Sequence, residues 1–293
     1  MRRIVGKKYK DIRVVQTKIA VLILSHSLPE ALNLHQEYWS NKADLYVHVD
    51  SKVPRDRIPS NHGLTFVPQI NIYWGGWSMV QATMSLIETA RNKKPYHRYV
   101  LISDDSTPLI PIHDMISRLS EPKEFIWIYS ENEHHFVERY TNFYLPDHPA
   151  TSAVWTPLEA KIMDDSFFSS VKEAENLKKR GKKPVAFRHG DQWWALSSNC
   201  INIASYSFKN DHWLTNSFRF SMVPDEQYFH TVVGKLYKEK FLFSVRNRPN
   251  GDNVFHSIKD IVETVPNGYL FARKIDVSIP EISTLVRTGI IPK

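Results

Sequence analysis

Cysteine is nearly absent from this chain of 293 residues, in which Cys200 is the single thiol. One thiol forms neither an internal disulfide nor a metal site of several cysteines, and it gives no sign of an oxidising compartment. Long apolar runs are absent too: none approaches the ~18 residues of a membrane-spanning helix, and none follows the basic N-terminus as a signal peptide requires. We therefore expect a cytoplasmic protein, or one held peripherally at the inner face of the membrane by the basic segment Met1–Lys10.

Glycine is also sparse, at 10 residues, and neither a Gly-x-Gly-x-x-Gly nor a Walker-type loop occurs. This disfavours a dinucleotide site and an ordinary P-loop NTPase, so any bound phosphate must be held by side chains. Histidines do not predict a metal site, because the adjacent His134 and His135 would point apart. No Gly-x-Ser-x-Gly elbow is present, which disfavours serine hydrolase chemistry.

Positive charge is in excess, with a formal net charge of +7 and a pI of about 9.3. Such a chain favours an anionic partner: nucleic acid, acidic lipid head groups or a phosphorylated substrate. Nucleic acid is the weaker choice, because the basic runs carry no interleaved aromatics and no recognised binding module.

Apolar runs alternate with helix-like segments in the first half of the chain. The runs 18–26, 43–50, 64–67 and 96–103 predict buried strands, and Pro29–Ser40 and Ser78–Arg91 predict helices, with Ser78 as the N-cap of the second. This rhythm is typical of right-handed βαβ units, so we predict an α/β fold with a mostly parallel, Rossmann-like sheet flanked by helices.

The second half is less regular. It predicts strands at 125–129, 241–245 and 270–276, helices at 164–179, 198–207 and 224–234, and a loop-rich stretch at 131–149. We expect a single domain over residues 18–276, preceded by a basic tail at 1–17 and followed by a C-terminal tail at 277–293.

Ligands of such a sheet bind beyond the carboxyl ends of its strands. The strands end here in polar residues, namely Ser25, His26, Asp50, Asp104 and Asp105. These predict a binding crevice, although polar residues follow strands in every α/β protein. Asp104 and Asp105 could hold a divalent ion with waters and phosphates, but the spaced Asp-x-Asp of metal-dependent sugar-nucleotide enzymes is missing, so we expect no required metal.

Two aromatic segments have two readings each. Trp74-Gly75-Gly76-Trp77 and Gln192-Trp193 could offer ring faces to a sugar or a base, with Gly-Gly allowing close backbone approach. Alternatively these tryptophans belong to the core.

Pro224-Asp225-Glu226 predicts the first turn of a helix, where the helix dipole favours carboxylates. An ionised carboxylate there could act as a general base, or the motif could be no more than a well-capped helix start. Arg273-Lys274 is either a solvated pair or, if it faces the crevice, a pair of cations able to balance a diphosphate.

Several of these motifs, in this order, resemble the core-2/I-branching glycosyltransferases (glycosyltransferase family 14), which include β-1,6-N-acetylglucosaminyltransferases and peptide O-xylosyltransferases. The resemblance covers Lys18 to Asp276 and is carried by Val47–Asp50, Trp74–Ser78, Val100–Ser103 with Pro108–Leu109, Gly190–Trp193, Pro224–Glu226 and Leu270–Asp276. The chain lacks the anchor and cysteine framework of the animal Golgi members, so it looks like a bacterial-type relative.

The resemblance implies a GT-A fold, a UDP-sugar donor, a glycan or other hydroxyl acceptor, and inversion at the anomeric carbon. Glu226 matches the catalytic base and Lys274 a cation that contacts the donor diphosphate in place of a metal, with Arg246 or Arg248 as its partner. Asp50 matches a uridine-binding position and Trp74 an aromatic near the nucleotide.

We assign the remaining candidates to two subsites. The donor side takes Ser25, His26, Gly75 and Arg273, and the acceptor or sugar side takes Trp77, Asp104, Asp105, Gln192, Trp193 and Asp225. The chain departs from the family pattern at Ser106, where an aspartate is frequent, and at Asp191, where a serine is frequent. These departures leave the donor sugar open between N-acetylglucosamine and xylose. A non-catalytic carbohydrate-binding protein and a basic nucleic-acid-binding protein remain as alternatives.

Overall fold

A computed structural model describes residues 18–60, 62–129, 139, 144–145, 147, 187–234 and 254–291, and the backbone of 243–244. The predicted helix at 164–179, most of the predicted loop at 131–149, and both Arg246 and Arg248 lie outside the described residues.

The main sheet has six strands in the order β3-β2-β1-β4-β7-β6. Its strands are β1 (Ile19–Ser25), β2 (Ala43–Val49), β3 (Leu64–Phe66), β4 (Arg98–Ser103), β6 (Phe125–Ile126) and β7 (Trp194–Ser197). The first four are parallel, and at one edge β7 runs antiparallel to both of its neighbours, β4 and β6. β1 and β4 lie at the centre, which explains why they read as unbroken apolar runs. The predicted mostly parallel α/β sheet is confirmed.

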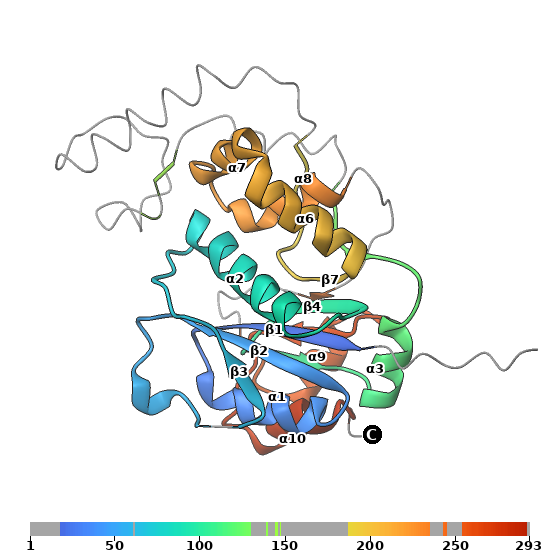
Figure 1. Cartoon of the computed structure of the whole chain (residues 1–293). Coiled ribbons are helices and arrows are strands. Elements are labelled where there is room, and N and C mark those ends of the chain that lie inside the picture. Colours follow the sequence, from blue (N-terminus) through green and yellow to red (C-terminus); the bar gives the residue numbers. More distant parts are fainter. Residues whose placement is uncertain are drawn as a thin grey trace, which may run out of the picture.

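Helices cover both faces of this sheet (Figure 1). The short 3₁₀ turn η1 (Pro29–Ala31) leads into α1 (Leu32–Trp39), which lies on one face beside α10 (Pro280–Thr288). On the other face lies α2 (Trp77–Lys93), with α6 (Ser198–Asn210), α7 (His212–Arg219) and α8 (Tyr228–Val233) beyond it. The described residues also form η2 (Arg55–Arg57), α3 (Ile112–Leu119), η4 (Pro224–Glu226) and α9 (Ile258–Thr264).

A small second sheet determines where the late basic residues lie. Its order is β5-β9-β8, with β5 at Ser106–Pro108, β8 at Phe243–Ser244 and β9 at Phe271–Arg273. β5 follows β4 after only two residues, and it pairs antiparallel with β9 so that Ser106 faces Arg273. This pairing brings the end of β9 beside the carboxyl end of β4, about 170 positions earlier in the chain.

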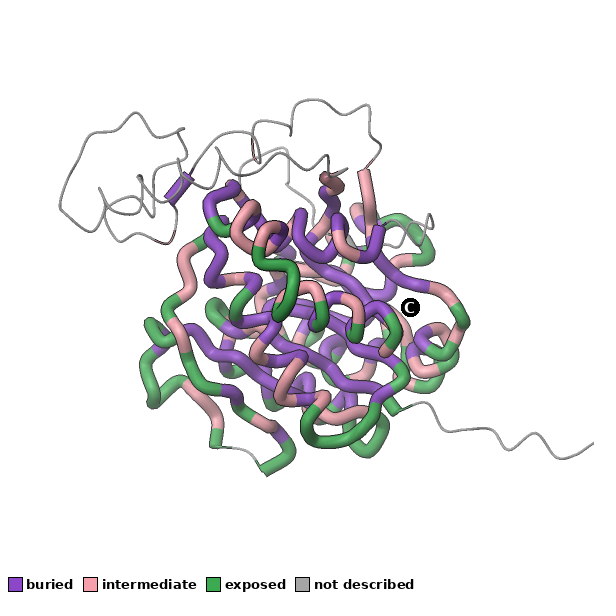
Figure 2. The backbone as a smooth tube through the Cα atoms, turned by 45° about the horizontal axis from the view of Figure 1, so that its top comes forward, coloured by how far each residue is buried: buried purple, intermediate pink, exposed green. Residues whose placement is uncertain are grey.

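The C-terminal segment differs from the prediction of a tail. Residues 280–288 form α10, which buries Ile282, Leu285 and Val286 in a second apolar cluster together with Phe255 and Ile275. Their i, i+3, i+4 spacing is that of one helix face, and Pro280 suits the first helical turn. In Figure 2 the central part of the backbone is mostly buried, whereas the surrounding helices and loops include half-buried and exposed residues.

Two predicted helix starts also differ. α2 begins at Trp77 with Gly76 as its N-cap, and Ser78 instead lies inside the first turn, where Asp147 accepts hydrogen bonds from it. The predicted helix at 224–234 is divided into a 3₁₀ turn, η4 (Pro224–Glu226), and α8, because Gln227 has a non-helical φ of −128°.

Candidate functional site

A pocket of about 600 Å³ opens at the carboxyl ends of β1, β2 and β4. Two groups of residues line it. We call the first the strand-end group, which consists of Ser25, His26, Asp50, Asp104 and Asp105. We call the second the second-half group, which consists of Asp191–Trp193, Val223, Asp225, Glu226, Arg273 and Lys274.

Asp104 organises the loop after β1. Its Oδ2 accepts hydrogen bonds from Ser25 Oγ at 2.9 Å, His26 N at 2.8 Å and Leu28 N at 2.9 Å. Burial, with a contribution from neighbouring Asp105, raises the pKa of Asp104 to about 6. Since one oxygen already accepts three donors, the first role of this carboxyl is to hold the rim of the pocket in place.

Asp105 forms an ion pair with Arg273. Arg273 Nε lies 3.1 Å from Oδ1 and Nη2 lies 3.3 Å from Oδ2, and Ser103 also donates to Oδ1. This cation keeps the pKa of Asp105 below its ordinary value despite burial. The guanidinium also lies over the ring of Trp193, 4.5 Å from its centroid. Arg273 is thus largely neutralised where the sequence suggested a free cation.

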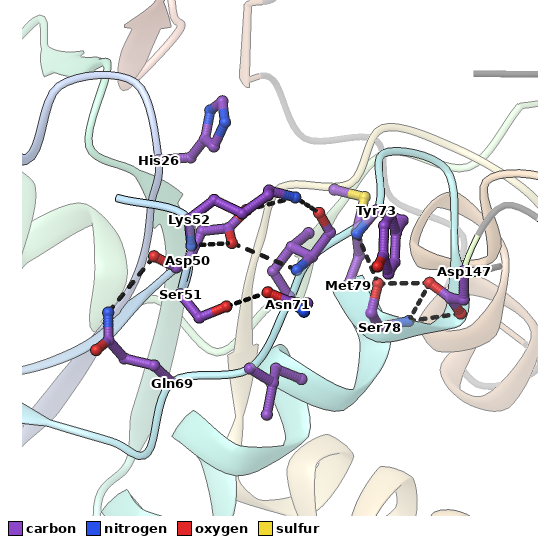
Figure 3. Close-up of polar contacts among 12 residues, drawn as sticks. His26, Asp50, Ser51, Lys52, Gln69, Asn71, Tyr73, Ser78, Met79 and Asp147 are labelled. Carbon is purple, nitrogen blue, oxygen red and sulfur yellow. Dashed lines mark hydrogen bonds and ion pairs between the residues drawn. The ribbon is translucent and has the colours of Figure 1, made fainter. Parts of the chain in front are cut away.

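Asp50 is buried and also paired (Figure 3). Its Oδ2 lies 3.2 Å from Lys52 Nζ, and its Oδ1 accepts from Lys52 N at 3.0 Å and Ile72 N at 3.5 Å. Lys52 also donates to the carbonyl of Ile72 and lies 5.1 Å from the ring centroid of Tyr73. The half-exposed ammonium of Lys52, more than the buried Asp50, is therefore the group available to a ligand here.

Residues 69–73 are joined to the end of β2 by several further bonds. Ser51 N donates to Ile70 O at 3.2 Å, Ile70 N donates to His48 Nε2 at 3.2 Å, and the Ser51 hydroxyl bonds Asn71. These contacts hold the segment that leads into Trp74, which is 57% exposed and lines the pocket.

A strained turn places Glu226 at the pocket. Val223 has a φ of +54°, a left-handed conformation that a β-branched residue rarely adopts. Its N–H donates to Gly75 O at 2.9 Å, its carbonyl accepts from Glu226 N at 3.1 Å, and Gly75 itself has a φ of +74°. Strain of this kind costs on the order of 1–3 kcal/mol and is typical of functional sites.

Glu226 carries a half-buried carboxylate that is paired with Arg139. Arg139 Nη1 donates to Glu226 Oε2 at 2.8 Å. Burial raises the pKa of Glu226 above its ordinary value, and Arg139 opposes that rise. On the backbone, Gly190 N donates to Glu226 O at 2.9 Å, and a Cβ on Gly190 would overlap the carbonyl of Trp127.

Asp225 and Gln192 hold buried polar atoms without a partner. Asp225 is 3% exposed and Gln192 is 8% exposed, and within the described part of the molecule neither Asp225 Oδ1 nor Gln192 Nε2 has a hydrogen-bond partner. Burial and the adjacent Glu226 raise the pKa of Asp225 well above its ordinary value, which favours a neutral acid. Because unsatisfied buried groups are costly, such atoms at a pocket indicate places for ligand atoms.

Lys274 completes the second-half group with a positive charge. Its backbone has a φ of +62°, again left-handed, and its carbonyl accepts from Phe255 N at 2.7 Å. Within the described part of the chain, its ammonium forms no hydrogen bond or ion pair. This leaves Lys274 able to bind an anion.

The structure brings most predicted site residues together. Those that line the pocket are Ser25, His26, Asp50, Trp74, Asp104, Asp105, Gln192, Trp193, Asp225, Glu226, Arg273 and Lys274. Gly75 is buried behind Val223. Trp77, expected to bind sugar, is instead a core residue stacked on Phe208 at 5.9 Å and packed edge-on against Tyr228.

Three functional candidates were assigned to no subsite from the sequence. Lys52 follows Asp50 by two positions, and an acidic residue so close to a lysine could have suggested a pair. Asp191 adjoins Gln192, and its carboxylate accepts from Tyr129 at 3.0 Å. Arg139 lies 87 positions from Glu226, and no local pattern indicates that pairing.

Among the described residues, no group of three or more histidine, cysteine, aspartate or glutamate side chains is arranged to hold a metal ion. In the same part of the chain, no helix is both long and apolar enough to cross a membrane.

A mostly parallel sheet flanked by helices, with a polar pocket at its carboxyl ends, defines an α/β protein of GT-A-like fold. The family model named Core-2/I-Branching enzyme matches residues 19–247, and the chain belongs to this family. Membership implies glycosyltransferase activity, with a nucleotide sugar as donor and a glycan as acceptor. None of the curated proteins compared with the sequence matches it.

Proposed function

We propose that the protein is an inverting glycosyltransferase that moves a sugar, N-acetylglucosamine or else xylose, from a UDP-sugar to a hydroxyl group of a glycan. The observation that carries the proposal is that Glu226 and Lys274, about fifty positions apart in sequence, line one pocket. A base and a cation in one pocket are the two groups that a single displacement needs.

In the proposed reaction, Glu226 removes the proton from the acceptor hydroxyl as its oxygen attacks the anomeric carbon. The bond from that carbon to the diphosphate breaks on the opposite face, and UDP leaves with the electron pair. General-base help of this kind contributes about 10²–10⁴-fold to the rate.

Charge on the leaving diphosphate would be balanced by side chains, without a required metal. Lys274 is the main candidate because its ammonium is uncommitted among the described residues, whereas Arg273 is shared with Asp105. Arg246 or Arg248 stays the proposed partner of Lys274. Removing one such electrostatic partner typically lowers turnover by about 10²–10³-fold.

Gln192 and Asp225 would bind the transferred sugar through hydrogen bonds. Their unbonded polar atoms offer an amide donor and a neutral carboxyl to hydroxyl or acetamido groups. The nucleotide would lie toward Lys52 and Trp74, beside residues 69–73, which are hydrogen-bonded to the end of β2.

Binding of nucleotides tests the donor assignment without knowledge of the acceptor. We expect UDP, UDP-N-acetylglucosamine or UDP-xylose to raise the melting temperature, and ADP and oligonucleotides not to do so. Stabilisation by free glycans alone would favour a non-catalytic carbohydrate-binding protein. Steeply salt-dependent stabilisation by oligonucleotides would favour nucleic-acid binding.

The role of metal is tested by release of UDP from the stabilising donor in EDTA. We expect turnover to persist in EDTA. Abolition by EDTA with rescue by manganese would contradict the side-chain account and would direct attention to Asp104 and Asp105 as ligands.

A further inference from the structure

The pairing of Glu226 with Arg139 poses a chemical problem. A base must be ionised to accept a proton, yet it must not be so stabilised by a cation that it loses its basicity. Glu226 is half-buried, and its burial favours the protonated acid, while Arg139 at 2.8 Å favours the carboxylate. The arginine therefore sets the balance between these two states.

Both members of the pair are anchored through their backbones. Met222 N donates to Arg139 O at 2.8 Å, so Arg139 is bound to the turn that carries Glu226. Glu226 is fixed through its own N–H to Val223 O and through its carbonyl to Gly190 N. Hence the two side chains meet from backbone segments that are themselves hydrogen-bonded to each other.

The pair leaves one carboxylate oxygen for chemistry. Arg139 binds Oε2, and within the described residues Oε1 accepts no hydrogen bond. Glu226 lines the pocket, with its side chain about one-third exposed. A carboxylate held by one oxygen keeps a fixed direction for the other, as a proton acceptor in a displacement requires.

Charges around Glu226 make the arginine necessary. Asp191, which also lines the pocket, disfavours a second negative charge on Glu226, and the charge of Glu226 in turn favours the protonated form of the adjacent Asp225. Arg273 also lies within electrostatic range, but Asp105 already neutralises much of its charge. Arg139 is thus the main group in the described part of the chain that favours ionised Glu226.

We propose that Arg139 is a positioning residue of the transfer reaction, holding Glu226 ionised through Oε2 and directing Oε1 at the acceptor hydroxyl. This inference rests on the proposed role of Glu226 as base. It assigns Arg139 no contact with the reacting atoms.

The titration of Glu226 tests the inference directly and needs no substrate. Glutamate labelled with ¹³C at the side-chain carboxyl would be followed by NMR from acid to alkaline pH, with the Glu226→Gln variant identifying the resonance. In Arg139→Met we expect the titration midpoint of Glu226 to rise by about one pH unit, at the low end of the 1–3 units that an opposite charge confers, because the group is partly exposed. Arg139→Lys should restore much of this difference. A midpoint unchanged in Arg139→Met would overturn the inference.

A second readout is the pH profile of UDP release from UDP-N-acetylglucosamine, with water as the acceptor probe. Since the base must be ionised, the acidic limb of the profile should move to higher pH in Arg139→Met. Activity at pH values well below the midpoint of this limb should therefore fall about tenfold, and activity at alkaline pH should recover. An equal loss at every pH would mean a merely structural role and would contradict the inference.

Controls separate this inference from the proposed function. Arg287→Met removes an exposed arginine that pairs with Glu37 away from the pocket, and it should leave the profile unchanged. Glu226→Gln should be inactive at every pH. If that variant were active, the proposed base would be wrong, whereas an inactive Glu226→Gln with an unmoved limb in Arg139→Met would refute only the inference.

Discussion

The strand-end group and the second-half group share one pocket, but their polar atoms are satisfied differently. Asp50, Asp104 and Asp105 each bind lysine, arginine or backbone N–H groups of the protein itself. Among the described residues, Asp225 and Gln192 retain buried polar atoms without a hydrogen-bond partner, and the ammonium of Lys274 forms no hydrogen bond or ion pair. Two residues of the second-half group, Val223 and Lys274, also have positive φ angles, whereas no residue of the strand-end group does.

This difference indicates that the strand-end group mainly stabilises the structure of the pocket, whereas the second-half group is available to bind and transform a ligand. Carboxylates at the ends of parallel strands are easily identified in a sequence, yet here they mainly hold loops and a cation in place. The irregular second half holds the groups with unused hydrogen-bonding capacity and the strained backbone, as expected of a site prepared for a ligand. The following substitutions test this division, from the largest expected effect to the smallest.

Glu226→Gln should have the largest effect on activity. The amide keeps the shape of the side chain but cannot accept a proton at neutral pH, so turnover should fall by at least ~99% while donor binding persists. UDP release and nucleotide-induced stabilisation, measured on the same preparation, check both parts. Full turnover in this variant would show that Glu226 is not the general base.

Trp77→Ala and Trp74→Ala should separate the core from the pocket. Trp77 is buried against Phe208 and Tyr228, so truncation should destabilise the protein by about 3–5 kcal/mol. Trp74 is largely exposed, so its truncation should change stability by less than about 1 kcal/mol and should instead weaken binding of UDP. Urea denaturation and nucleotide titration measure the two effects, and a stability loss of equal size in both variants would argue against the distinction.

Gly190→Ala should disturb the turn that carries Glu226. Its Cβ would overlap the carbonyl of Trp127, and relief of such crowding costs typically about 1–3 kcal/mol. Because Gly190 N binds the carbonyl of Glu226, turnover should fall as well. Gly63→Ala is the matched control, because the atoms nearest to its Cβ belong to the flexible side chain of Gln36, and the substitution should be nearly neutral. Normal turnover in Gly190→Ala would show that the turn tolerates displacement.

Asp104→Asn should have the smallest effect, visible as a change in pH dependence. The pKa of Asp104 is raised to about 6 in the folded protein, above its ordinary 3.8. The unfolded chain therefore releases this proton first, and stability from Asp104 falls as pH rises from about 4 to 6. Asn can keep the three bonds at one oxygen and cannot ionise, so its stability relative to wild type should increase across this window. Urea denaturation at several pH values measures the difference in unfolding free energy between the variant and the wild type. A difference that stayed constant across the window would contradict the raised pKa of Asp104.

Much of the fold was predictable from local pattern. The apolar runs that became β1, β2 and β4 are unbroken because these strands are covered on both faces, and their order along the chain required parallel connections. The pairing of β7 with β6 and the docking of α10 were harder to predict, because short segments such as Phe125–Ile126 carry little periodicity and the partner of α10 lies near the start of the chain.

The sequence by itself determined which residue types were available at the site: a carboxylate after a helix-starting proline, a late Arg-Lys pair, and polar residues after each strand. Only the tertiary structure decided their states. It formed three ion pairs, in which Asp105 neutralises Arg273, Lys52 pairs with Asp50, and Arg139 pairs with Glu226. The physical reason is that ionisation and hydrogen-bonding capacity depend on burial and on neighbours a few ångströms away, and those neighbours lie up to 168 positions apart in the chain.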